Sequence, residues 1–188
     1  MLKPPDIRRD ETGRAAARPQ RVLAVASAGG HWVQLMRLRP AWDDCAVSYL
    51  TTNDGYRDMV MEDAAERGQA RPRYFTVVAA NRWRKLRLIR QCLEICAVVL
   101  RVRPNVVITT GAAPGYLAIR LGKLIGARTV WVDSIANAQE MSLSGQKAGR
   151  HSDMWLTQWD HLGGRDERRP AAPPIGGRSY DFLDRWKR

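Results

Sequence analysis

The sequence has few cysteines and no long apolar run. Only three of its 188 residues are cysteine, namely Cys45, Cys92 and Cys96, and they show neither CxxC spacing nor a histidine-rich ligand pattern. This usage is typical of a reducing compartment and predicts no structural zinc. No apolar run reaches the roughly 18 residues of a membrane-spanning helix. Residues 1–20 are polar and Arg-rich, unlike a signal peptide, so we expect a cytoplasmic protein that is not integral to a membrane.

Several signatures of nucleotide and catalytic chemistry are also missing. The first glycine-rich turn reads SAGGHW instead of GxGxxG, and the second predicted strand ends in Thr51-Thr52 without the acidic residue of a nicotinamide site. The chain has no GxxxxGK[ST] loop and no GxSxG elbow. Its basic residues accompany no helix-turn-helix, sheet aromatics or zinc spacing, which argues against nucleic-acid binding. The function class that these absences leave is chemistry on sugars or phosphates. We expect it to need no metal and no cofactor.

Basic residues are abundant. Lys and Arg number 31 against 19 Asp and Glu, so the formal charge is +12, which favours anionic partners such as acidic lipids or phosphorylated substrates. The length and the hydrophobic content of 45% fit one domain with a real core. We expect this domain over residues 21–162, after a mobile basic tail at 1–20 and before a Gly-, Pro- and Arg-rich tail at 163–188, a candidate for partner contact.

The chain is organised around residues 21–38. The apolar run VLAV is typical of a strand buried on both faces, and it ends in the glycine-rich turn at 27–31. A helix follows, with Gln34 off its apolar stripe and Pro40 ending the run. The residues of the stripe are Trp32, Leu35, Met36 and Leu38. Strand, glycine-rich turn and helix open a doubly wound domain, whose ligands bind outside the carboxyl ends of the strands.

The remaining pattern repeats this unit. We expect strands at 46–51, 73–79, 105–110, 128–132 and 155–158, helices at 56–67, 83–103 and 116–125, and a helical turn or interaction tail at 180–186. The fold class predicted is α/β, with a single Rossmann-like, doubly wound parallel sheet.

Three polar loops follow predicted strands and should meet at one edge of the sheet. The glycine-rich segments at 29–30 and 111–115 would offer backbone N–H groups to a phosphate, or their glycines serve only as turn residues. Asp133 and Asn137 would contact sugar hydroxyls or close a subunit interface. The candidate substrate-binding residues are Ser27, Gly29, Gly30, Thr110, Gly111, Pro114, Gly115, Asp133, Ser134 and Asn137.

His31 ends the first glycine-rich turn and is the candidate general base, because imidazole accepts protons near neutral pH. A capping or ligand-orienting role is the equal alternative. Glu140 is a weaker second candidate for the base.

The predicted helix at 83–103 has an apolar sector wider than one contact with a sheet requires. Either the helix lies between the sheet and a neighbouring helix, or part of it docks on an anionic membrane or a partner. The residues assigned to this face are Trp83, Arg84, Lys85, Leu88, Cys92, Ile95 and Val99.

Several blocks between Val22 and Leu162 resemble a known family, in family order. They read SAGGH at 27–31, TTGAAPG at 109–115, WVDSIAN at 131–137, LSG at 143–145 and LTQW at 156–159. The sequence resembles the acceptor-side subunit of two-part glycosyltransferases. This family includes the membrane-recruiting subunit of the enzyme that adds the second N-acetylglucosamine in dolichol-linked oligosaccharide synthesis. Its bacterial branch in capsule and exopolysaccharide synthesis is the closer match.

The resemblance implies half of a GT-B glycosyltransferase, inactive without its partner. This chain would be the N-terminal, acceptor-binding domain, and a separate chain would bring the UDP-sugar. The acceptor would be a glycan on polyprenyl diphosphate at the inner face of the plasma membrane. The eukaryotic subunit begins with a transmembrane helix, which residues 1–20 cannot form, so attachment here should be peripheral or mediated by the partner. A non-catalytic scaffold and a stand-alone sugar-nucleotide enzyme such as an epimerase are the alternatives.

Overall fold

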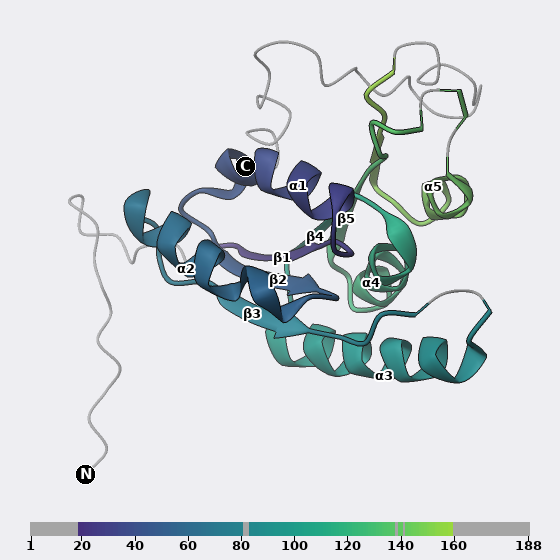
Figure 1. Cartoon of the computed structure of the whole chain (residues 1–188), viewed down its shortest axis with the longest axis horizontal. Coiled ribbons are helices and arrows are strands. Elements are labelled where there is room, and N and C mark those ends of the chain that lie inside the picture. Colours follow the sequence, from purple (N-terminus) through teal and green to yellow (C-terminus); the bar gives the residue numbers. More distant parts are fainter. Residues whose placement is uncertain (1–18, 81–82, 138, 141, 160–188) are drawn as a thin grey trace.

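A computed structural model describes residues 19–80, 83–137, 139–140 and 142–159 of the chain. The predicted tails, apart from residues 19 and 20, and the predicted turn at 180–186 lie outside these residues. The strands are β1 (Arg21–Val25), β2 (Ala46–Thr51), β3 (Arg73–Thr76), β4 (Val106–Thr109), β5 (Arg128–Val132) and β6 (Met154–Leu156). The α-helices are α1 (Gly30–Arg37), α2 (Arg57–Glu66), α3 (Lys85–Val102), α4 (Ala112–Leu124) and α5 (Leu143–Gly149), with 3-10 turns η1 (Arg39–Trp42) and η2 (Asp54–Tyr56) (Figure 1).

The strands form one six-stranded parallel sheet in the order β3-β2-β1-β4-β5-β6. Val22 of β1 pairs with Val47 of β2 on one side and with Val106 of β4 on the other. The chain first adds strands outward from β1 and then returns to the other side of β1, so the direction of winding reverses between β1 and β4. This arrangement confirms the predicted Rossmann-like α/β fold.

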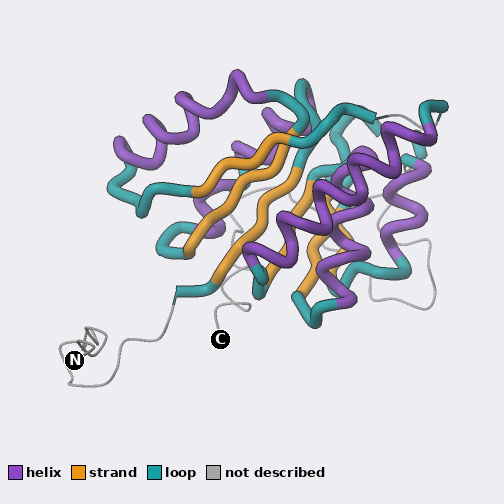
Figure 2. Tube along the Cα trace, turned by 90° about the horizontal axis from the view of Figure 1, so that it is seen from below, coloured by secondary structure: helices purple, strands orange, loops and turns teal. Residues whose placement is uncertain are grey.

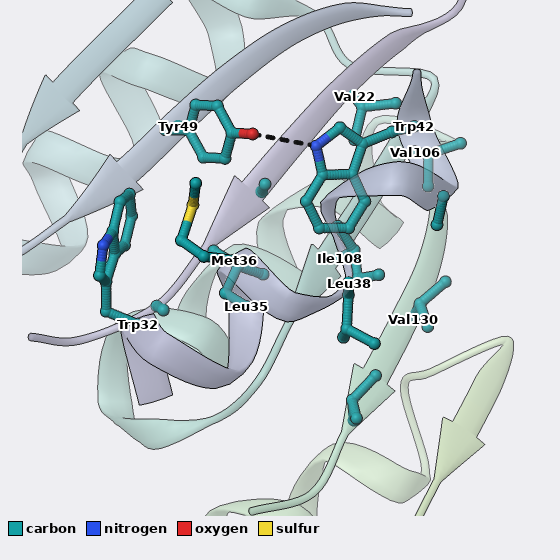
Figure 3. Close-up of a cluster of buried hydrophobic side chains, with 14 of the residues drawn as sticks. Val22, Trp32, Leu35, Met36, Leu38, Trp42, Tyr49, Val106, Ile108 and Val130 are labelled. Atoms are coloured by element: carbon teal, nitrogen blue, oxygen red, sulfur yellow. Dashed lines mark hydrogen bonds between the residues drawn. The ribbon is translucent and has the colours of Figure 1, made fainter. Parts of the chain in front are cut away.

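One layer of the core lies between the sheet and helices α1 and α2. Because side chains alternate along a strand, Val22 and Ala24 of β1 face this layer. Trp32 and Leu35 of α1 are buried against them, and Figure 3 shows the cluster continuing to Trp42, whose Nε1 donates a hydrogen bond to the hydroxyl of Tyr49 at 3.1 Å. The apolar stripe predicted for the first helix therefore packs on the sheet.

The second layer lies on the opposite face of the sheet. Leu23 and Val25 of β1 face it, together with side chains from α3, α4 and α5. Ile95 of α3 and Ile119 of α4 are both fully buried there. Figure 1 shows the sheet between α1 and α3, and Figure 2 shows α3 in front of the sheet, running along the strands.

Three differences between the structure and the sequence-based predictions affect the loops around the sheet edge. Helix α4 begins at Ala112 instead of residue 116, because Gly111 is its N-cap and Pro114 is tolerated in a first turn. Helix α5 was not predicted; the side chain of Ser142 caps it by accepting a hydrogen bond from the Gly145 N–H at 2.9 Å. Gln34, predicted off the apolar stripe, is buried because its side chain pairs with the residue that follows β5. Among the described residues, no helix combines the length and apolarity needed to cross a membrane.

Candidate functional site

The site lies at the carboxyl ends of β1 and β4, where the winding of the sheet reverses. These two strands are neighbours, and each is followed by a tight turn and a helix. The turn after β1 leads into α1, and Gly111 after β4 leads directly into α4. In open α/β sheets a crevice forms at such a reversal and is the usual place for a ligand. The sequence correctly predicted that both glycine-rich turns follow strands of one parallel sheet.

His31 and Thr110 join the two turns across this position. The Nδ1 atom of His31 lies 2.8 Å from the carbonyl oxygen of Thr110, and the hydroxyl of Thr110 donates to the carbonyl of His31 at 2.7 Å. A carbonyl only accepts hydrogen bonds, so Nδ1 carries the hydrogen, and in a neutral ring Nε2 is then the proton acceptor. The structure thus holds the half-buried imidazole in the tautomer that a general base requires.

Gly111 supports the histidine through its conformation. Its φ is +126°, outside the range that side chains favour, and the ring of His31 packs against its backbone. Its N–H donates to the Thr109 hydroxyl at 3.1 Å in a buried hydrogen bond. Gly111 therefore has a conformational role, and a contact of its N–H with phosphate stays a prediction.

The first glycine-rich turn is held by polar side chains that follow β2. Thr52 accepts a hydrogen bond from the N–H of Ala28 at 3.0 Å, and the hydroxyl of Tyr56 accepts one from the N–H of Gly29 at 3.2 Å. The Gly29 N–H is thus hydrogen-bonded within the protein, and its phosphate contact stays a prediction. Gly30 is exposed and opens α1, where N–H groups lack partners within the helix, so its phosphate contact stays a prediction.

Sequence reasoning missed Thr52 and Tyr56. The ring of Tyr56 stacks on Trp32 with centroids 4.9 Å apart and planes 8° apart, so it fixes the start of α1 as well as the turn. The available signal was their place shortly after β2, whose carboxyl end lies at the same edge as the glycine-rich turn.

Asp133 follows β5 and is 2% exposed. Its carboxylate accepts hydrogen bonds from the Ser142 hydroxyl at 3.0 Å, the Asn137 amide at 3.0 Å and the Trp131 indole N–H at 3.2 Å. Its carbonyl accepts the amide of Gln34 at 2.9 Å. Both carboxylate oxygens are therefore engaged within the protein. Asp133 orders the loop between β5 and α5, and its contact with a sugar or a subunit interface stays a prediction.

The other predicted site residues divide between the edge and the core. Ser27, Ser134 and Asn137 are half-buried at the carboxyl edge, and their ligand contacts remain predictions. Thr110 is buried, as are Pro114 and Gly115 of α4. A Cβ on Gly115 would lie 2.0 Å from the Thr109 hydroxyl oxygen, so Gly115 allows α4 to approach β4 and does not face a ligand.

Glu140 is exposed on the loop between β5 and α5. No hydrogen bond joins it to His31 in the described part of the chain, so its role as a second base stays a prediction. Residues 19–159, with the gaps given above, contain no group of three or more His, Cys, Asp or Glu side chains placed to hold a metal ion.

The predicted docking face of α3 needs correction. Ile95 and Val99 are 0% and 1% exposed, so the prediction is wrong for both, because this side of the helix packs on the sheet. Leu88 and Cys92 are half-buried. Trp83, Arg84 and Lys85 are exposed, as predicted.

No family model matches the chain. In sequence, it is 26% identical over 183 residues to the UDP-N-acetylglucosamine transferase subunit ALG14 of Eremothecium gossypii, an alignment that covers 84% of this chain and 80% of that protein.

The fold is shared with solved structures. Acinetobacter baumannii MurG matches with a TM-score of 0.57 at 12% identity, over 84% of this chain and 44% of its own. The UDP-N-acetylglucosamine 2-epimerase from Rickettsia bellii matches with a TM-score of 0.62 at 16% identity, over 90% of this chain and 48% of its own. The chain thus spans about half the length of these structures, and it has the Rossmann-like fold of the N-terminal half of GT-B glycosyltransferases.

Proposed function

We propose that this chain is the acceptor-binding, membrane-recruiting subunit of a two-component glycosyltransferase. A separate chain binds the UDP-sugar, and the two chains form the active enzyme. The acceptor is a glycan on polyprenyl diphosphate at the inner face of the plasma membrane, and the product is a precursor of a capsule or exopolysaccharide. The sequence similarity to a named transferase subunit supports the assignment to a heteromeric transferase.

The similarity to a transferase subunit supports a division of the two binding domains between two chains. A GT-B enzyme places its acceptor on one domain and its nucleotide-sugar on the other, with the chemistry between them. This chain aligns with 44% and 48% of the two solved structures above. Its described residues form one sheet with one switch point, and we assign the donor half to a second chain because the similar protein is named as a subunit.

The observation that carries the proposal is the 2.8 Å contact of His31 Nδ1 with the Thr110 carbonyl oxygen at that switch point, which leaves Nε2 as the proton acceptor of a neutral ring. During transfer, Nε2 of His31 takes the proton of the acceptor hydroxyl while the hydroxyl oxygen bonds to the anomeric carbon of the donor sugar. The bond from that carbon to UDP breaks, and UDP leaves with the electron pair. The N-terminal turn of α1, which begins at Gly30, offers N–H groups and a favourable dipole to the acceptor diphosphate.

The test is transfer by the complex of the full chain with its co-purified donor-binding chain. We expect His31→Ala to lower the rate about 10²- to 10⁴-fold, the usual contribution of a general base, while co-purification stays intact. His151→Ala is the matched control, because His151 lies after α5, close to the start of β5 at the opposite edge of the sheet.

Two results would contradict the proposal. Unchanged turnover of His31→Ala would reduce the chain to a non-catalytic scaffold. Binding or conversion of a UDP-sugar by the isolated chain, measured by calorimetry and product analysis, would instead indicate a stand-alone enzyme such as an epimerase.

A further inference from the structure

The outer face of α3 carries an uncovered apolar stripe. Its large side chains are 84% (Leu86), 57% (Ile89), 66% (Leu93) and 57% (Leu100) exposed. They are spaced by three, four and seven residues, which places them on one side of a helix. Trp83, just before the helix, is 78% exposed. Exposed apolar side chains aligned in this way mark an interaction surface.

This stripe is distinct from the side of α3 that belongs to the core. The buried residues of the helix are Gln91, Ile95, Val99 and Val102. Taking about 100° per residue, they centre on the side opposite the stripe. Figure 1 shows α3 along the lower margin of the molecule, and Figure 2, seen from below, shows it in front of the sheet. No described element covers its outer side in either view.

Positive charge runs beside the stripe. The basic residues of the helix and its two caps are Arg84, Lys85, Arg87, Arg90, Arg101 and Arg103. The single acidic residue of α3 is Glu94, whose carboxylate pairs with Arg90 at 2.8 Å and accepts the Val78 N–H at 2.8 Å. The face therefore presents apolar side chains flanked by cations.

We propose that this face of α3 is an interfacial docking surface for an anionic lipid bilayer. The helix would lie in the plane of the interface, with Leu86, Ile89 and Leu93 in the acyl boundary and the basic residues among the headgroups. A Trp- and Leu-bearing side next to Lys and Arg is the composition of helices that lie on membranes. Charge complementarity selects acidic lipid over a neutral surface.

The geometry suits a lipid-linked acceptor, and to that extent the inference rests on the proposed function. Helix α3 follows β3, so it starts at the carboxyl edge of the sheet, where His31 lies, and runs back along the strands. With α3 flat on the bilayer, this edge opens sideways along the membrane surface. A diphosphate in the headgroup layer then approaches the site without leaving the membrane.

The experiment is co-sedimentation of the full chain with vesicles of phosphatidylcholine mixed with phosphatidylglycerol, and with vesicles of phosphatidylcholine alone. We expect binding to the anionic vesicles that weakens as salt is added. The double variant Leu86→Ser, Leu93→Ser should lose about tenfold or more of this binding while its unfolding midpoint stays unchanged. Leu143→Ser is the matched control, since Leu143 is 62% exposed on α5 and should bind like the wild type.

Three outcomes would overturn the inference. The first is absence of binding to anionic vesicles, and the second is equal binding to both vesicle types. The third is full vesicle binding by the double variant together with loss of the co-purified chain. This third result would show that the face is a protein interface. The assay needs neither UDP-sugar nor partner, and His31→Ala should bind vesicles normally. Failure here is therefore distinguishable from failure of the proposed chemistry.

Discussion

A Cβ atom on Gly111 would lie 2.9 Å from Cε1 and 3.0 Å from Nδ1 of His31. The imidazole ring thus occupies space that only a residue without a side chain leaves free. Gly111 also adopts φ +126°, so glycine is needed at this position for two reasons: its backbone conformation and the space that the His31 ring fills. This glycine thereby sets where the candidate base can lie.

Gly111→Ala should destabilise the fold by roughly 1–3 kcal/mol, because alanine would be strained at this φ and would push against the histidine ring. Transfer by the complex should fall as well, since His31 loses its place. Gly30→Ala is the control, because a Cβ at Gly30 would meet nothing within 4 Å and its φ is ordinary. Chemical denaturation measures the stability of each variant, and transfer assays measure its activity in the complex. Equal stability of the two variants would show that the His31 ring does not depend on Gly111.

Asp133→Ala should loosen the loop between β5 and α5. The substitution leaves the Ser142 hydroxyl and the Trp131 indole N–H without their acceptor, and the cost of such unpaired groups is about 1–3 kcal/mol. Amide exchange in this loop should accelerate. Glu140→Ala, an exposed change on the same loop, should alter neither quantity. Unchanged exchange in Asp133→Ala would mean that the loop is held by other contacts.

Asp153→Asn should change how stability depends on pH. Partial burial of the Asp153 carboxyl opposes ionisation, but hydrogen bonds from Lys123 and Thr129 outweigh it and lower its pKa. Since the folded pKa is depressed, its contribution is present above the unfolded pKa and is lost as pH falls through the folded pKa. We expect the variant to be less stable at pH 7 by about 1 kcal/mol, discounted for solvent screening, and the difference to shrink in acid.

Urea denaturation at several pH values measures this effect. Glu62→Gln offers a control, because Glu62 is an exposed acidic residue in the middle of α2, away from the N-terminal end of the helix dipole. A constant difference between Asp153→Asn and the wild type across the acid range would contradict the assignment.

Much of the fold was predictable from local pattern. Apolar runs that end in glycine-rich turns predicted the strands of a parallel sheet, and helical periodicity predicted the helices between them. Helix α5 escaped prediction because its start depends on Ser142, whose side chain caps the helix and also contacts Asp133, nine residues earlier. Such a contact does not show in the hydrophobic periodicity of the sequence.

Propensity, periodicity and charge are properties of neighbouring residues, so the sequence was enough to predict the class of the domain, its basic character and His31 as the titratable side chain in the first glycine-rich turn. Tertiary structure alone decided which role each residue takes. Pairing of β1 with β4 brought His31 to Thr110 and selected the ring tautomer. Packing on the sheet buried Ile95 and left Leu93 in solvent, although both are apolar and lie two residues apart on α3. Such outcomes depend on contacts between segments distant in sequence, which no local pattern records.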